Sequence, residues 1–183
     1  MLKVENMSNI AIFDLDGTLV DTDAANAAAY GVALQHFGFA GIVGMYGRVT
    51  SDIVRNAANL DESELDVVVK AKIGAYCRQL GRTCLGLAVG ALRYVRDNRN
   101  AFSKVVLLTD SAERRAYETL RFWSLDGCFD EIVCNAGRGD KYSNYFKNFD
   151  SDPAACVVWE NENRQIKAAI AAGVKNENIR KVA

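Results

Sequence analysis

A short apolar segment that ends directly in a pair of aspartates constrains the fold of this chain more than any other feature. Asn9–Phe13 (NIAIF) runs straight into Asp14-Leu15-Asp16-Gly17-Thr18. Its length and its isoleucines are typical of a buried strand that stops at a polar loop. Ligands of open parallel sheets bind beyond the carboxyl ends of the strands, so this loop is the first place to look for a functional site.

Further strands and helices alternate along the second half of the chain. Four further segments with many apolar residues are predicted as strands: Lys104–Thr109, Asp130–Cys134, Ala155–Trp159 and, at the end, Ile179–Ala183. Ser111–Trp123 and Asn163–Ala172 have the apolar spacing of amphipathic helices. Asp110 followed by Glu113 resembles a capping box, and Gly173 suits the end of the second helix. This alternation predicts a Rossmann-like, three-layer α/β fold with a parallel sheet between helices.

The long segment between the first and second predicted strands has helical patterns only. These patterns cover Ala24–Phe37, Ser51–Asn59, Ser63–Leu80 and Leu87–Arg96, with glycine-containing segments at Gly38–Gly47 and Gly81–Gly86. An all-helical block of this size between two strands is best explained as an inserted α-helical cap over the carboxyl edge of the sheet. We therefore expect a core of residues 1–22 and 101–183 and a cap of residues 23–100.

The composition of the chain limits the kinds of molecule that the protein is expected to bind. The 183 residues include 22 basic and 23 acidic side chains, for a net charge of −1, which argues against a duplex-DNA binder. The five cysteines form no CxxC pair, so we expect free thiols in a reducing compartment rather than a zinc site. No stretch approaches the roughly 18 consecutive apolar residues of a membrane span. We expect a cytoplasmic monomer or homodimer that binds a small molecule, and neither nucleic acid nor a membrane.

Polar residues follow the strand ends in a pattern that suits phosphoryl chemistry. Besides the two aspartates, this set contains Thr109 after the second strand, Lys141 after the third, and Glu160, Asn161 and Glu162 after the fourth. Carboxylates, a hydroxyl and a lysine at one sheet edge suit an oxygen-loving divalent cation together with a phosphoryl group. Two aspartates separated by one residue can take two different catalytic roles. One attacks as a nucleophile, and the other donates and then accepts a proton.

Segments of the chain resemble, in order, the four motifs of the haloacid dehalogenase (HAD) superfamily. They are Asp14–Thr18 followed by Leu19–Thr22, Leu107–Ser111, Lys141, and Trp159–Glu162 ahead of Ile166–Gly173. The first and fourth motifs look like those of the subgroup that contains β-phosphoglucomutase and phosphoglycolate phosphatase. That subgroup carries a helical cap directly after the first motif. The resemblance spans residues 9–173 and implies a HAD-like fold.

The resemblance also implies a role for each matching residue. Asp14 would be the nucleophile that forms an aspartyl-phosphate, and Asp16 would be the general acid and base. The ligands of Mg²⁺ would be Asp14, the backbone carbonyl of Asp16, and Glu160 and Asn161 of the fourth motif; the phosphate-binding residues would be Thr109, Asp110 and Lys141. True dehalogenases of the superfamily lack the second aspartate, so Asp16 favours phosphoryl transfer. The implied activity is that of a Mg²⁺-dependent phosphatase acting on a small phosphorylated metabolite.

The sequence departs from this subgroup in places, and other functions stay open. Asn161 stands where the fourth motif has an aspartate, and Asp110 stands where asparagine is common. A sugar-phosphate mutase would use the same aspartyl-phosphate but return the phosphoryl group to a sugar hydroxyl. A degenerate HAD-like protein would bind a phosphorylated ligand or a protein without turnover. Glu162 is an alternative metal ligand to Asn161, and Arg48 is a candidate anion contact in the cap.

Overall fold

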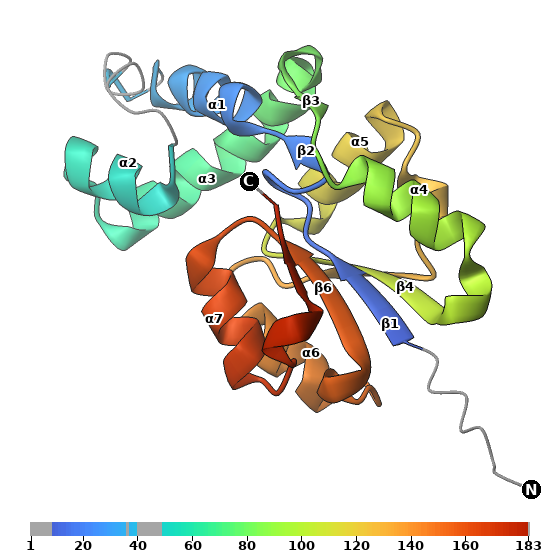
Figure 1. Ribbon diagram of the computed structural model, residues 1–183. Helices are drawn as coiled ribbons and strands as arrows, with labels where there is room; N and C mark the ends of the chain where they lie inside the picture. The colour runs from blue at the N-terminus through green and yellow to red at the C-terminus, as the bar shows by residue number, and fades with distance from the viewer. Residues whose placement is uncertain (1–8, 36, 40–48, 183) are drawn as a thin grey trace, which may run out of the picture.

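The centre of the molecule is a five-stranded parallel sheet with the strand order β5-β4-β1-β6-β7 (Figure 1). The computed structural model describes residues 9–35, 37–39 and 49–182. The strands of this sheet are β1 (Asn9–Phe13), β4 (Phe102–Thr109), β5 (Glu131–Cys134), β6 (Cys156–Glu160) and β7 (Ile179–Lys181). They match the predicted strands to within one or two residues at each end. The predicted three-layer α/β fold is confirmed.

Helices cover both faces of this sheet. They are α4 (Val89–Asp97) and α5 (Glu113–Phe122) on one face and α6 (Lys141–Asn148) and α7 (Asn163–Ala171) on the other, as Figure 1 shows. Side chains of β4 alternate between the two layers: Leu107 packs in the cluster of α4 and α5, and Leu108 in the cluster of α6 and α7. This alternation follows from the two-residue period of a strand. Buried apolar contacts on both faces therefore fix the strand ends that carry the polar loops.

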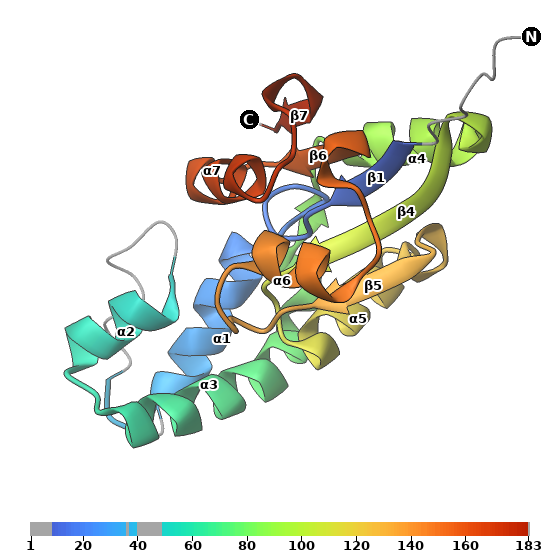
Figure 2. The same ribbon diagram turned by 90° about the horizontal axis from the view of Figure 1, so that it is seen from below.

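The remaining helices form a separate group beside the sheet, at the carboxyl ends of its strands (Figure 2). We call α1 (Asp23–Gln35), α2 (Ser51–Ala58) and α3 (Glu62–Tyr76) the helical group. They pack on one another through apolar clusters of their own, around Tyr30, Leu34 and Val68 in one and around Tyr76 in the other. A 3₁₀-helix, Cys77–Arg82, continues α3. The candidate anion contact Arg48 lies outside the described residues.

Helix α4 belongs to the sheet and not to the helical group. The expected cap, residues 23–100, included this segment because its sequence has only a helical pattern. In the structure, Leu92 and Val95 are buried in one cluster with Val105 and Leu107 of β4. A helical pattern shows that one face of a helix is apolar but not which neighbour covers it. We therefore place the end of the helical group near Arg82.

The start of α5 also differs from expectation. The helix begins at Glu113, and its N-cap residue Ala112 makes no side-chain capping bond. The predicted capping box at Asp110 is wrong, because the Asp110 carboxylate instead accepts hydrogen bonds from Asn135 Nδ2 and Gln165 Nε2, each at 2.7 Å. Asp110 thus ties together the loops after β4 and β5 and the first turn of α7.

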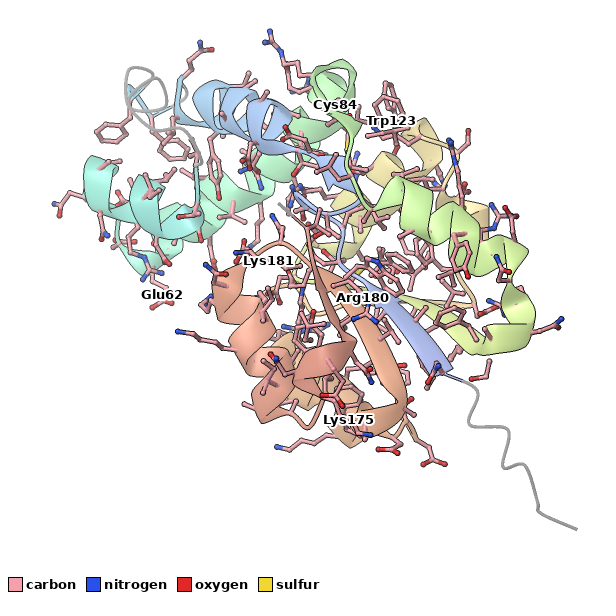
Figure 3. All side chains as sticks on the ribbon, in the orientation of Figure 1. Glu62, Cys84, Trp123, Lys175, Arg180 and Lys181 are labelled. Carbon is pink, nitrogen blue, oxygen red and sulfur yellow. The ribbon has the colours of Figure 1, made fainter. Side chains whose placement is uncertain are left out.

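Two very short strands join the helical group to the sheet. In β2 (Val20–Asp21) and β3 (Cys84–Leu85), Val20 pairs with Leu85 and Asp21 with Cys84 in antiparallel register. Next to β3, Trp123 Nε1 donates a hydrogen bond of 2.9 Å to Thr83 Oγ1. Figure 3 labels Cys84 and Trp123 on this side of the molecule. The two-stranded connection and the tryptophan hold the segments that lead into and out of the helical group.

Gly86 allows this connection to pack closely, which gives a first prediction. A Cβ atom at Gly86 would lie 2.3 Å from the backbone oxygen of Thr18. Gly86→Ala should lower the free energy of unfolding by about 1–3 kcal/mol, the usual cost of overpacking. Gly90→Ala is the control, because a Cβ there meets nothing within 4 Å and helix α4 should gain stability. Urea unfolding of both variants measures the difference, and equal midpoints would contradict the prediction.

Two expectations from composition can be compared with the described residues. The five cysteines are all free, as predicted. In the described ranges, no helix has the length and apolar character that a membrane crossing requires.

Candidate active site

A cavity of about 500 Å³ lies at the carboxyl ends of the strands, between the sheet and the helical group. The loops after β1 and β6 contribute Asp14, Asp16 and Glu162, and the helical group contributes Tyr30 and Lys72. Of the residues that sequence analysis placed at the strand ends, the parallel topology brings five to this cavity: Asp14, Asp16, Lys141, Glu160 and Glu162. Thr109 and Asn161 are not among the residues that line it.

Lys141 joins two carboxylates at the floor of this cavity. It is the first residue of α6, where the N-cap Asp140 accepts a hydrogen bond from the Ser143 backbone N–H. Its Nζ lies 2.7 Å from Asp14 Oδ1 and 2.8 Å from Glu160 Oε2. Tyr142 donates a further hydrogen bond of 3.0 Å to the same Glu160 oxygen. The three charged groups are almost completely buried and form one connected cluster.

The charges of this cluster are unequal in number, and this shifts the pKa values of its members. Burial raises the pKa of Asp14 to about 7, against the opposing effect of Lys141 and with support from Glu160 and Asp16. Burial alone would lower the pKa of Lys141, but Asp14, Tyr142 and Glu160 hold it well above its usual value. One lysine shared by two carboxylates leaves Asp14 incompletely neutralised. Such a perturbed carboxyl in a cavity is a candidate reactive group.

Asp16 lies in a second cluster, formed with α5 and the segment before α1. Arg115 contacts both of its carboxylate oxygens, through Nη2 to Oδ1 and through Nη1 to Oδ2 at 3.3 Å. Thr22 and Ser111 donate hydrogen bonds of 2.5 Å to Oδ1 and Oδ2. Burial alone would raise the pKa of Asp16, but Arg115 and the two hydroxyls lower it below its usual value. Asp16 is therefore held as a carboxylate.

The predicted phosphate-binding residues occupy three different environments. Lys141 contacts Asp14 directly, as described above. Thr109 is fully buried, and its hydroxyl accepts a hydrogen bond of 3.1 Å from the Ser111 backbone N–H. Asp110 lines the cavity, but its carboxylate is held by Asn135 and Gln165. In this arrangement Thr109 shapes the loop after β4, and Asp110 fixes it against its neighbours.

Oxygen atoms suited to Mg²⁺ are present at the loop after β1. Asn161 packs on Gly17, where a Cβ atom would lie 2.2 Å from Asn161 Nδ2, and Thr18 Oγ1 donates to Asn161 Oδ1 at 3.3 Å. The Asn161 amide thus lies against the loop that carries Asp14 and Asp16. Within the described residues, no three His, Cys, Asp or Glu side chains gather as a metal-binding group. Mg²⁺ commonly uses only one or two carboxylates beside water and substrate phosphate, so this donor set fits it.

Glu160 is less suited to ligate a metal than the sequence suggests. Its Oε2 accepts hydrogen bonds from Lys141 and Tyr142. Its Oε1 accepts hydrogen bonds from the backbone N–H groups of Asn161 and Glu162, at 3.0 and 3.1 Å. Both oxygens are occupied by donors, so Glu160 serves to position Lys141 and the loop after β6.

A comparison with known protein families shows to which family the chain belongs. The profile of the haloacid dehalogenase-like hydrolases matches residues 11–178. The chain belongs to this family. The predicted family and the predicted enzyme class, a hydrolase, are confirmed. A comparison with curated protein sequences finds no match.

Several solved structures of other proteins have the same fold. A proposed β-phosphoglucomutase from Thermotoga maritima is 25% identical, with a TM-score of 0.65 over 94% of this chain and 84% of that one. A predicted phosphatase from Clostridium acetobutylicum is 16% identical, with a TM-score of 0.72 over 91% and 82% of the two chains. CbbY from Rhodobacter sphaeroides, in complex with phosphate, is 15% identical, with a TM-score of 0.71 over 91% and 84%.

Sequence analysis of this HAD-like hydrolase did not predict the roles of Arg115 and Lys72. Arg115 follows Ser111 by four residues, and its Nη1 contacts Ser111 Oγ at 2.5 Å. Ser111 lies just before α5 and Arg115 lies in the first turn of that helix, so the short spacing could have indicated that Arg115 reaches the loop after β4. Lys72 offered no such signal, because its place at the cavity depends on how the helical group packs beside the sheet.

Proposed function

We propose that this HAD-like hydrolase is a Mg²⁺-dependent phosphomonoesterase that acts on a small phosphorylated metabolite through an aspartyl-phosphate at Asp14. One observation carries the proposal: the Asp14 carboxylate stands at the end of the central strand, lines the cavity, and is held by Lys141 at 2.7 Å. In the described part of the chain, the side-chain hydrogen bond to Asp14 reaches Oδ1 only. The other oxygen is available to attack phosphorus.

The two half-reactions use the same pair of aspartates. In the first, Asp14 Oδ2 forms a bond to phosphorus, the bond between phosphorus and the ester oxygen breaks, and the leaving alcohol takes a proton from Asp16. In the second, water attacks phosphorus, the bond to Asp14 breaks, and Asp16 accepts the proton of the water. Lys141 offsets the negative charge that gathers on the phosphoryl oxygens. The products are an alcohol and inorganic phosphate.

Asp16 is in the form required for the second half-reaction. Its contacts with Arg115, Ser111 and Thr22 stabilise the carboxylate, which is the proton acceptor. The first half-reaction requires a protonated Asp16, so the bond pattern around this side chain must change when substrate binds.

Mg²⁺ would be held by Asp14, the backbone carbonyl of Asp16 and the side-chain oxygen of Asn161. When bound, it offsets charge on the phosphoryl group, which would otherwise repel an attacking carboxylate. Asn161 is a neutral ligand where a carboxylate is usual, so we expect weak binding of the ion. Glu160 would act on this site through Lys141 rather than by direct contact.

Asn161 gives the second prediction. Asn161→Asp should tighten Mg²⁺ binding roughly 10-fold, because a carboxylate attracts a hard dication more strongly than an amide does. Calorimetric titration with Mg²⁺ measures the effect without reference to activity. Glu162→Gln is the matched comparison, because Glu162 is the alternative ligand in this loop. A loss of affinity in Glu162→Gln, with no gain in Asn161→Asp, would make Glu162 the ligand instead.

A phosphate-release screen tests the proposed function. The protein is incubated with sugar phosphates, nucleotides and phosphoglycolate, with and without Mg²⁺, and inorganic phosphate is measured. Mg²⁺-dependent release from at least one ester is the expected result. Transfer to a second sugar hydroxyl without phosphate release would indicate a mutase. Thermal stabilisation by ligands with no turnover of any ester would indicate a binding protein.

A further inference from the structure

A buried lysine of the helical group lines the cavity and forms no ion pair with a carboxylate of the described residues. Lys72, in α3, is 8% exposed, and its ammonium lies over the ring of Tyr30, 4.8 Å from the centroid. Among the ion pairs of the described residues, none includes Lys72. A buried charge without a counter-ion is costly and is rarely kept without a reason.

Arg115 brings a second cation to the same part of the cavity. Its guanidinium lies over the ring of Tyr76, 4.6 Å from the centroid, and its paired carboxylate is Asp16. Its Nε is buried and has no hydrogen-bond partner among the described residues. Burial and the charge of Arg115 together lower the pKa of Lys72 to about 7, and Asp16 offsets only part of this effect. Two neighbouring cations thus share one carboxylate.

Asp16 contacts Arg115 directly. The other acidic side chains of the cavity belong to other segments. They come from the strand ends and from the starts of α1 and α2, where Asp23 and Asp52 line the cavity. The stretch formed by α3 and α5 therefore presents two cations, Lys72 and Arg115, against one paired carboxylate, Asp16, and this excess of positive charge favours a further anion there.

We propose that Lys72 and Arg115 form a subsite for a second anionic group of the substrate, a carboxylate or a second phosphate on the alcohol that leaves. The proposal rests on the proposed phosphatase function, since it assigns the transferred phosphoryl group to Asp14 and Lys141. One cavity of about 500 Å³ is lined by all four residues, and this is the size of a site for a small metabolite. The second anion would neutralise Lys72 and pair with Arg115 by charge-assisted hydrogen bonds.

Matched esters test the subsite by binding. Glycerol 3-phosphate and 3-phosphoglycerate differ mainly in a terminal hydroxyl or carboxylate, and fructose 6-phosphate and fructose 1,6-bisphosphate differ in a second phosphate. Dissociation constants are measured by calorimetry in an Asp14→Asn background, so that no turnover is needed. We expect the more anionic member of at least one pair to bind at least 10-fold more tightly, and the pair that shows this identifies the second group.

Variants of the two cations complete the test. Lys72→Met and Arg115→Met should each lower affinity for the more anionic ester roughly 10- to 100-fold and change affinity for its neutral partner much less. Lys70→Met, on the exposed side of α3, is the control and should change neither. The melting temperature of Lys72→Met should not fall below that of the parent, because methionine keeps an apolar stem like that of lysine and removes a buried charge.

The outcomes separate the subsite from the phosphatase proposal. Equal affinities within both pairs, or a ratio that either variant leaves unchanged, overturns the subsite. Selective binding that depends on both cations supports it even if the parent protein releases no phosphate from any ester. That second result would overturn the phosphatase proposal alone.

Discussion

Asp14→Asn should reduce phosphate release by at least roughly 1,000-fold, the scale of loss when a nucleophile is removed. An amide oxygen cannot replace the carboxylate that attacks phosphorus. The fold should survive, because burial raises the pKa of Asp14 to about 7 and therefore penalises its charged form. A neutral amide at this position should leave the melting temperature at pH 8 no lower than that of the parent.

Release of inorganic phosphate and thermal unfolding are the two measurements for this variant. Asp97→Asn, at the exposed end of α4, is the control for loss of a carboxylate and should keep full activity. If Asp14→Asn kept most of its phosphate release, Asp14 would not be the nucleophile, and the roles derived for this cavity would be wrong.

Lys141→Met should have the largest effect on stability. The Lys141 ammonium is the shared counter-ion of Asp14 and Glu160, at 2.7 and 2.8 Å. Its removal leaves two buried carboxylates without a counter-charge, which costs about 3–5 kcal/mol for a broken buried pair. The loss of stability relative to the parent should become smaller as pH falls. Unpaired buried carboxyls have raised pKa values, and once they are protonated they need no counter-charge.

Urea unfolding at pH 8 and pH 5 measures this loss. Lys147→Met, on the exposed side of the same helix, should unfold like the parent. The triple variant Asp14→Asn, Lys141→Met, Glu160→Gln removes all three charges and should recover much of the stability. A triple variant as unstable as Lys141→Met would show that packing of the lysine stem, not charge, stabilises this cluster.

The sheet could be predicted because its strands are short, dense apolar segments. Asn9–Phe13 and Lys104–Thr109 carry their own signal, and β4 starts only two residues earlier than expected. The two-residue strands β2 and β3 were missed, because two residues are too few to show a period. A different limit applies to α4, because its apolar stripe could be recognised from the sequence but the sheet face that covers it could not.

The candidate site was predictable in part for the same reason. Asp14 and Lys141 follow strands and Glu160 is the last residue of one, so parallel topology alone brings them to one edge. The contacts of Asp16 with Arg115, and the position of Lys72, depend on side chains from α5 and α3 that meet only in the folded molecule. From the sequence alone, the proposed role of Asp110 in phosphate binding could not be compared with its hydrogen bonds to Asn135 and Gln165. These bonds depend on how the loops after β4 and β5 pack against α7.

The pairing of Asp21 with Cys84 has a consequence for how such a protein could diversify. The chain leaves the sheet and returns to it at adjacent positions, so the path of the sheet does not depend on what lies between them. The entropy of closing a loop grows only slowly with its length, so segments of very different size could be exchanged here. The exchanged segment would bring its own equivalents of Tyr30 and Lys72 to the cavity, while Asp14 and Lys141 stay in place. Substrate choice could then evolve as a replaceable part, separate from the chemistry.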